Sequence, residues 1–281
     1  MSAQDIETNS PDLWFKHWPW PEGDTHKHAR GALGCVTGPA ASTGAARLSA
    51  RAGLRVGAGL ATLFSPPGAV LVNASHETAV MVKPFRDTEE LAALAETCQC
   101  ALIGPGAGVS DATRNNTLTI LEKAGSAVLD ADALTVFKDE PETLFQKVNR
   151  PTLFTPHPGE FGRLFPKLLD TETREAAASM AAVRSGAVVI LKGAESVIAS
   201  PDGSIVRNTH ASPFLATAGS GDVLAGIAGG LMAQGMPVFE AACAACWVHG
   251  DLGCRLGPGL IAEDLPDALP ALLADFYDSK A

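Results

Sequence analysis

The segment 216–226 has the residue types and spacing of a phosphoryl-transfer site. It reads Ala-Thr-Ala-Gly-Ser-Gly-Asp-Val-Leu-Ala-Gly, which places small residues directly ahead of an apolar run. Small residues let consecutive backbone N–H groups converge at a helix start, where the helix dipole also attracts phosphate oxygens. Asp222 lies just inside this predicted helix. Its carboxylate can accept the proton of a substrate hydroxyl while the N–H groups hold the transferring phosphoryl group.

A purely structural role for Asp222 is the alternative, because aspartate is a good helix cap. Capping alone requires neither the Gly-Ser-Gly ahead of Asp222 nor the glycines Gly226, Gly229 and Gly230 behind it. The composition of the whole segment therefore favours a catalytic base.

Two glycine- and proline-containing loops follow predicted strands and could contact a ligand. The loop Gly104-Pro-Gly-Ala-Gly108 would let the backbone approach a flat or charged ligand, although a simple turn explains it equally well. In the loop Thr155-Pro-His-Pro-Gly-Glu160, two prolines restrain the chain and present His157 and Glu160 rigidly. The position of His157 at the end of a strand favours ligand contact.

Charged residues end two other predicted strands. Lys192 is followed by Gly193, so its cation could neutralise nucleotide phosphates, or it could face solvent at the edge of a hairpin. Asp130 and Asp132 could orient a metal–phosphate group or a sugar hydroxyl. Capping of the next helix is the favoured interpretation for Asp132. The small-residue loop 38–45 leads into a helix and is compatible with a ligand wall.

A C-x-x-C pair offers a different chemistry. Cys243 and Cys246 are followed by His249 at helical spacing, which leaves a metal or redox site open. The surrounding segment is alanine-rich and apolar, and no second pair supplies further ligands. Such cysteines more commonly act as small buried hydrophobes.

The elements that must position these residues alternate along the chain. Strands are predicted at 33–37, 69–72, 79–82, 101–104, 127–130, 152–155 and 188–192, with a hairpin of 196–199 and 205–208. Helices are predicted at 44–55, 88–97, 111–124 and 171–185, with two apolar helices from about 219 and 238. This alternation predicts an α/β fold in which helices cover both faces of a mostly parallel central sheet. Ligands then bind beyond the carboxyl ends of the strands.

The chain of 281 residues is expected to form a single domain, 1–281. Residues 1–30 are predicted to be an irregular N-terminal arm that Trp14, Trp18 and Trp20 attach to the body. The net charge of the whole chain is −10. This charge argues against nucleic-acid binding, which needs many basic residues, but backbone N–H groups can still bind a small anion. The polar start and the interruption of the longest apolar stretch at 234–237 predict a cytoplasmic protein without a membrane span.

Several of these segments occur together, in the same order, in one known family. They cover roughly residues 25–275 and comprise 27–31 (KHARG), 44–48 (GAARL), 104–106 (GPG), 130–134 (DADAL), 155–160 (TPHPGE), 191–193 (LKG) and 219–226 (GSGDVLAG). In these motifs the chain resembles the NAD(P)H-hydrate dehydratases of the ribokinase-like superfamily. The segment 219–226 alone would also fit many sugar and vitamin kinases, whereas 130–134 and 155–160 are more discriminating.

The resemblance implies a nucleotide-repair reaction. Hydrated NADH or NADPH carries a 6-hydroxyl on its nicotinamide ring, and the family phosphorylates the S-form at that hydroxyl and then eliminates phosphate. Bacterial members typically convert ADP to AMP, and eukaryotic members use ATP. The resemblance also implies Mg²⁺ as the ion that bridges the phosphates.

The resemblance also assigns roles to individual positions. Asp222 would be the catalytic base. The anion hole would comprise Gly219, Ser220 and Gly221. The substrate would contact Ala45, Gly106, Gly108, His157 and Asp222. The nucleotide would contact Lys192, Gly193, Ala194, Glu195, Ser196 and Gly221. No residue is assigned as a direct metal ligand.

Two segments depart from the family pattern. Ala218 replaces a glycine that the family often has, and the loop 208–213 lacks a common glycine, which puts the nucleotide-side loop in doubt. With about 25–30 residues before the first motif, the epimerase domain of many relatives has no room here, so a separate epimerase is expected. A homo-oligomer, with a tetramer as a candidate form, is also expected. The alternatives are a kinase of a thiazole- or pyridoxal-type alcohol and a nucleotide-binding regulatory module without catalysis.

Overall fold

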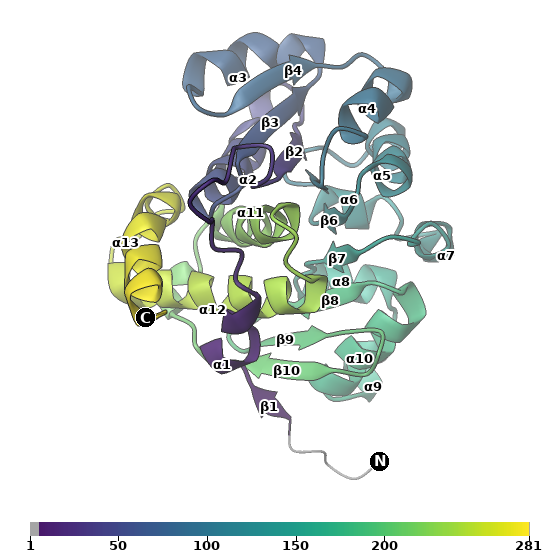
Figure 1. Ribbon diagram of the computed structural model, residues 1–281. Helices are drawn as coiled ribbons and strands as arrows, with labels where there is room; N and C mark the ends of the chain where they lie inside the picture. Colours follow the sequence, from purple (N-terminus) through teal and green to yellow (C-terminus); the bar gives the residue numbers. More distant parts are fainter. Residues whose placement is uncertain (1–5, 281) are drawn as a thin grey trace.

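A single ten-stranded sheet runs through the molecule, as the computed structural model shows for residues 6–280 (Figure 1). Its strand order is β1-β10-β9-β8-β7-β6-β5-β2-β3-β4. The seven strands from β8 to β4 are parallel, and β9 is antiparallel to both of its neighbours. The strands are β1 (Glu7–Thr8), β2 (Ala32–Val36), β3 (Leu60–Ser65), β4 (Met81–Pro84), β5 (Cys100–Ile103), β6 (Ala127–Leu129), β7 (Thr152–Phe154), β8 (Val188–Leu191), β9 (Ser196–Ala199) and β10 (Ile205–Asn208).

Helices cover both faces of the sheet, as predicted. One face packs against α1 (Pro11–Trp14), α2 (Gly44–Arg55), α11 (Ser220–Ala233), α12 (Val238–Leu256) and α13 (Asp264–Ser279). The other apolar core lies under α4 (Thr88–Ala95), α5 (Asp111–Lys123), α6 (Asp132–Thr135), α7 (Pro141–Phe145), α8 (Pro158–Leu164) and α10 (Arg174–Ser185). Two short helices, α3 (Val70–His76) and α9 (Leu168–Thr171), complete the set that the described residues form. None of these helices has the length and apolarity to cross a bilayer.

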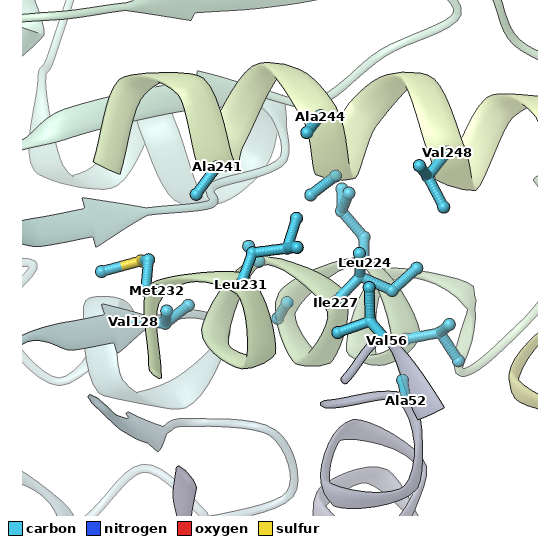
Figure 2. Packing of buried hydrophobic residues seen from close by; sticks show 14 of the residues in the cluster. Ala52, Val56, Val128, Leu224, Ile227, Leu231, Met232, Ala241, Ala244 and Val248 are labelled. Atoms are coloured by element: carbon cyan, nitrogen blue, oxygen red, sulfur yellow. The ribbon is translucent and has the colours of Figure 1, made fainter. Parts of the chain in front are cut away.

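The helix α11 is the central element of the site-bearing face. It is apolar on all sides, as expected of a helix that is buried all round, and every residue from Val223 to Ala233 is buried. Figure 2 shows its Leu224 and Leu231 facing α12, while α2 packs on another side. This packing holds the start of α11, and therefore Asp222, against the sheet.

Glycines allow α11 and α2 to touch backbone to backbone. A Cβ at Gly226 would lie 2.2 Å from the main-chain oxygen of Ser49, and one at Gly230 would lie 2.6 Å from that of Gly53. These glycines were interpreted from the sequence as part of a functional segment. The structure shows that Gly226 and Gly230 serve helix packing.

We expect Gly226→Ala to lower the free energy of unfolding by about 1–3 kcal/mol, because the added methyl group overpacks the contact with Ser49. Urea unfolding measures this change. The matched control is Gly162→Ala inside α8, where the new Cβ has open space, so a change of at most about 1 kcal/mol is expected. Equal stability of Gly226→Ala and wild type would contradict the packing role.

The structure corrects several predicted elements. Residues 60–65 form β3, which the sequence analysis missed, and the predicted strand 69–72 is the start of α3. The residues before that segment are Pro66-Pro67-Gly68, and proline favours the start of a helix. Because Leu71 is 77% exposed, the apolar run is not a buried strand. The helices α6, α7, α9 and α13 were also not predicted.

The N-terminal arm is more regular than predicted. Residues Glu7–Thr8 pair with β10, and Pro11–Trp14 form α1. The predicted attachment through tryptophans is confirmed for Trp14, which is fully buried, and for Trp18, which is 7% exposed. Trp14 also donates its indole N–H to Asn9, whose amide donates to Asn208 at the end of β10. The irregular description was wrong for residues 7–17, where these local contacts order the chain, whereas residues 18–30 form only turns and loops, as predicted. Residues 1–5 of the predicted arm lie outside the described residues.

Candidate active site

The predicted functional loops meet at one edge of the sheet. The loop after β2 carries residues 37–43, the loop after β5 carries 104–108, and Asp130 follows β6 directly. His157 follows β7, and Lys192 follows β8. Because all five strands are parallel, their carboxyl ends lie on the same side, and the start of α11 lies there too.

The start of α11 has the geometry of an anion hole. Gly219 is left-handed (φ 87°, ψ −15°) and occupies the N-cap position, and Ser220, Gly221 and Asp222 form the first helical turn. The first N–H groups of a helix have no intrahelical acceptors and point outward, and a left-handed residue followed by helical ones makes them converge. Since Gly219 is the N-cap, the capping interpretation of Asp222 is wrong.

Lys192 brings a cation to this helix start. A Cβ built on Gly221 would lie 3.4 Å from the Lys192 ammonium nitrogen, so the amine lies directly beside the anion hole. The same nitrogen donates to Asp130 Oδ1 at 2.8 Å, and the two side chains are 19% and 2% exposed. The alternative of a solvent-facing hairpin lysine is therefore wrong.

The carboxyl group of Asp222 has a pKa near neutral pH. Burial raises its pKa from 3.8 to about 7, the charge of Asp130 adds to the rise, and Lys192 opposes it. A general base is most effective when its pKa lies near the working pH. The main-chain oxygen of Asp222 accepts from Ser49 Oγ at 2.8 Å, which fixes this turn of α11 to α2.

This pKa predicts how Asp222 affects stability. The raised folded-state pKa means that the neutral carboxyl stabilises the fold fully below about pH 4, and that this contribution is lost as the pH rises through about 7. We therefore expect the free energy of unfolding of Asp222→Asn to exceed that of wild type by more at pH 8 than at pH 5. Urea unfolding at both values tests this. An equal difference at the two values would contradict the raised pKa.

The predicted substrate loops lie against each other. A Cβ at Gly106 would lie 2.4 Å from the main-chain oxygen of Ser42 and 3.6 Å from Ala45 Cβ. Ala45 in turn accepts from Ser49 Oγ, the same hydroxyl that bonds Asp222. Ala45, Gly106 and Asp222 are thus joined through α2, as expected of one binding surface.

Asp132 supports this surface and does not cap a helix. It is the first residue of α6, and its carboxylate accepts the N–H of Gly108 at 2.8 Å. Ala131, at the N-cap position, has a φ of 46°, an uncommon conformation for alanine. The predicted capping role of Asp132 was wrong because its carboxylate instead holds the 104–108 loop.

His157 has a structural role that the sequence analysis did not assign. Its Nδ1 accepts the N–H of Gly159 at 3.0 Å, and Glu160 accepts the N–H of His157 at 2.9 Å, which forms a capping box at the start of α8. The side chain is 52% exposed and borders the cavity described next. Substrate contact by His157 stays a prediction.

A cavity of about 720 Å³ adjoins the anion hole. Its lining includes the predicted residues His157, Lys192, Gly193, Ala194, Ser196, Ser220 and Gly221. Glu195 is the exception among the predicted nucleotide contacts, because its carboxylate lies 3.9 Å from Arg207 Nε and does not line the cavity. A second cavity of about 750 Å³ lies beyond β2, β3 and β5 and includes Gly108 in its wall.

The cavity also includes residues to which sequence reasoning assigned no individual role. Some belong to segments that were expected at the site, namely Asn208, Ala211, Ser212 and Pro213 of the nucleotide-side loop and Ala216, Thr217 and Leu224 of the segment 216–226. The others, Leu215, Cys246, His249 and Gly250, were not expected at this site. The loop 208–213 rests on α12, where a Cβ at Gly250 would lie 1.8 Å from the main-chain oxygen of His210. For His249 and Gly250, the small size of Gly250 beside a histidine was the available signal.

The C-x-x-C pair lies in the packed interior of α12. Cys243 and Cys246 are buried, and burial raises the pKa of both thiols, for Cys246 to about 12. Thiols of this kind are poor nucleophiles and poor metal ligands. His249 bonds Ser220 instead, and no group of three or more potential metal ligands occurs in residues 6–280. The structure does not support the metal or redox alternative.

A mostly parallel sheet, a glycine-bordered anion hole and a poised aspartate at one helix start define a ribokinase-like phosphoryl-transfer enzyme. The chain belongs to the NAD(P)H-hydrate dehydratase family, whose model matches residues 33–269.

Individual relatives agree with this assignment. The chain is 38% identical over 263 residues to the ADP-dependent (S)-NAD(P)H-hydrate dehydratase of Neisseria meningitidis, covering 87% of this chain and 86% of the relative. It is 39% identical over 263 residues to the bifunctional NAD(P)H-hydrate repair enzyme of Gloeobacter violaceus, covering 89% of this chain and 51% of the relative. The chain thus spans about half the length of the bifunctional relatives it matches.

Solved structures agree on the fold. The ADP/ATP-dependent NAD(P)H-hydrate dehydratase of Bacillus subtilis, co-crystallised with ATP and Mg²⁺, superposes with a TM-score of 0.85 at 26% identity, covering 98% of this chain and all of that one. A ribokinase-like superfamily protein of Enterococcus faecalis gives a TM-score of 0.86 at 25% identity, with 98% of both chains covered. The predicted fold class is confirmed.

Proposed function

We propose that this protein is an ADP-dependent (S)-NAD(P)H-hydrate dehydratase that repairs hydrated NADH and NADPH. The observation that carries the proposal is the position of Asp222, whose pKa is about 7, in the first turn of α11 beside the anion hole and the Lys192 cation. The Neisseria relative, which this chain covers over most of its length, bears that activity in its name.

The first step is a phosphoryl transfer to the 6-hydroxyl of the hydrated ring. Asp222 takes the hydroxyl proton as the oxygen attacks the terminal phosphorus of the nucleotide. The phosphorus–oxygen bond to the leaving nucleotide then breaks, so ADP leaves as AMP. The N–H groups of Gly219, Ser220 and Gly221 and the Lys192 ammonium would stabilise the charge on the transferring group.

The second step is the loss of the new phosphate. The lone pair of the ring nitrogen expels phosphate from C6, and loss of a proton from C5 restores the ring double bond. The sum of both steps removes water from the hydrate and transfers it formally to ADP, giving AMP and inorganic phosphate. In this step the protein holds the ring and binds the leaving phosphate.

The assignment of the two cavities follows from their walls. The cavity of about 720 Å³ borders Lys192, Ser196 and Gly221 and suits the nucleotide. The cavity of about 750 Å³, whose wall includes Gly108, suits the hydrated dinucleotide, whereas Ala45 and Gly106 border neither cavity. The side chain of Glu195 faces Arg207, so we expect Glu195 to contact the nucleotide through its main chain.

Mg²⁺ suits the carboxylates around Lys192. Burial lowers the pKa of Lys192, but the charges of Asp130, Glu160 and Asp222 raise it, so carboxylates lie in the neighbourhood of this cation. Among residues 6–280 no three potential ligands are grouped to hold a metal ion by themselves, so phosphate oxygens would have to complete the site. Mg²⁺ commonly combines one or two carboxylates with substrate phosphates and water. When bound with the nucleotide, the ion would neutralise charge on the phosphates. The Bacillus structure with ATP and Mg²⁺ supports this expectation for the family fold.

The assay measures recovery of the reduced-nicotinamide absorbance with hydrated NADH, Mg²⁺ and either ADP or ATP. We expect recovery that depends on nucleotide, is faster with ADP and releases one phosphate per ring restored. A stable phosphate ester of a small alcohol, without absorbance recovery on the hydrate, would instead establish the kinase alternative. Nucleotide binding without either product would point to a regulatory module.

We also infer the organisation of the protein in the cell. The expected form is one dehydratase domain over residues 1–281, assembled as a homo-oligomer in the cytoplasm, where its nucleotide substrates are used. The relatives that are named bifunctional repair enzymes carry a second activity, which supports an epimerase as the metabolic partner of this dehydratase domain. Size-exclusion chromatography with light scattering measures the assembly directly.

A further inference from the structure

Ser220 and His249 form a side-chain pair at the edge of the anion hole. Ser220 is the first residue of α11 and is buried, and its Oγ lies 2.9 Å from Nε2 of His249 on α12. The packing of α11 against α12, which Figure 2 shows, fixes this approach. Both residues line the cavity of about 720 Å³.

The imidazole of His249 is neutral at physiological pH. Burial lowers its pKa from 6.5 to about 4, and the positive charge of Lys192 acts in the same direction, while a bond to the Ser220 main chain opposes it. A neutral imidazole has one N–H donor and one acceptor nitrogen. The hydroxyl of Ser220 can donate or accept, whereas its main-chain oxygen can only accept. The bond to the Ser220 main chain therefore favours a hydrogen on the nitrogen that faces Ser220.

The direction of this bond decides what Ser220 can do. A serine hydroxyl has one hydrogen to donate. When Oγ accepts from His249, that hydrogen is free to point into the anion hole, where it adds a donor to the backbone N–H groups. When Oγ donates to His249 instead, the hydroxyl offers the phosphoryl group no hydrogen.

We propose that His249 is a positioning residue that donates its Nε2 hydrogen to Ser220 and thereby directs the Ser220 hydroxyl hydrogen at the transferring phosphoryl group. This inference rests on the proposed function, and it assigns His249 a role in the charge stabilisation of that reaction. His249 acts through Ser220 and does not itself exchange a proton with the substrate.

Kinetic analysis of variants tests the pair. We expect Ser220→Ala and His249→Ala each to lower kcat by about 10²-fold, as for loss of one anion-hole donor, while KM for ADP changes much less. The double variant should be no slower than the slower single variant, because both changes remove the same donor. Additive losses in the double variant, or a normal kcat in His249→Ala, would overturn the proposal.

Two conservative substitutions of His249 distinguish a positioning role from a packing role. His249→Gln places an amide nitrogen near the Nε2 position, whereas His249→Asn places one near Nδ1. We expect Gln to restore most of the lost kcat and Asn to restore little of it. Equal behaviour of the two variants would indicate a packing role. The matched control is His76→Gln on α3, outside this cavity, which should retain normal kcat.

A spectroscopic readout distinguishes this inference from the proposed function. If wild type restores no absorbance from hydrated NADH, the proposed function fails, but the pair can still be tested by ¹⁵N NMR of the histidine rings. We expect His249 to be neutral at pH 6 and protonated on Nε2, with a signal that shifts in Ser220→Ala and on addition of ADP and Mg²⁺. A hydrogen on Nδ1, or a signal unaffected by Ser220→Ala, would overturn the inference whatever the reaction.

Discussion

Asp222→Asn is expected to leave a folded protein whose kcat is about 10²–10⁴-fold below wild type, the usual contribution of a general base. Asparagine keeps the size of the side chain but cannot accept the hydroxyl proton. The backbone anion hole at Gly219–Gly221 and the Lys192 cation remain, so KM for the nucleotide should change little. The measurement is nucleotide-dependent recovery of reduced-nicotinamide absorbance, with thermal unfolding as the check on the fold.

The matched control for this substitution is Asp139→Asn, an exposed aspartate in the loop between α6 and α7. It makes the same chemical change away from the anion hole, and we expect wild-type turnover. Near-normal turnover of Asp222→Asn would show that another group takes the proton. A large rise in the nucleotide KM with unchanged kcat would show that Asp222 only helps to bind ligand.

Lys192→Met is expected to affect both stability and turnover. Asp130 is only 2% exposed, so removing its partner at 2.8 Å leaves a buried, unpaired carboxylate, which costs about 3–5 kcal/mol in free energy of unfolding. The same change removes the cation beside Gly221, and we expect kcat/KM to fall by about 10²–10³-fold. Urea unfolding and the absorbance assay measure the two effects separately.

A second substitution separates the two roles of Lys192. In the double variant Lys192→Met with Asp130→Asn, the buried charge is gone, so most of the stability should return while turnover stays low. Lys123→Met is the control, because Lys123 pairs with Glu96 at 3.2 Å on the surface and should contribute at most about 1 kcal/mol. Recovery of turnover together with stability in the double variant would show that Lys192 acts only as a structural partner.

Asp130 also explains why Asp222 differs electrostatically from an ordinary helix-start carboxylate. Burial is the largest cause of its raised pKa, and the charge of Asp130 is the next. The ion pair with Lys192 stabilises the charge of Asp130 in the interior. The same buried pair positions a cation for the phosphates and helps to keep the pKa of Asp222 near 7. Neither residue could do this alone, because an unpaired buried charge would be too costly.

The sequence by itself determined the fold class and placed the proposed base, Asp222, at the start of a helix. The helix start at 216–222 is a local signal, because small residues, a left-handed glycine and an apolar run act within a few positions of each other. The apolar runs that became β2, β5, β6, β7 and β8 alternate with helices, and this alternation requires parallel strands with loops on one edge. The positions of Lys192, His157 and the 104–108 loop follow from that rule.

Where the local signals conflicted, sequence reasoning failed. Residues 69–72 are apolar and β-branched enough for a strand, but the prolines before them begin a helix. Residues 60–65 follow a glycine-rich stretch and were overlooked, although they form β3 between β2 and β4. Asp132 follows a strand in the manner of a helix cap, but the approach of the 104–108 loop gives its carboxylate another partner.

Only the tertiary structure decided which side chains meet. Lys192 and Asp130 are 62 positions apart, and Ser220 and His249 are 29 positions apart on two different helices. Strand order and helix packing determine such contacts, and a shift of one residue in a helix would turn His249 away from Ser220. Residue types and spacing define what chemistry a local segment can perform, whereas pKa values, ion pairs and hydrogen-bond directions depend on neighbours that the folded chain brings from elsewhere.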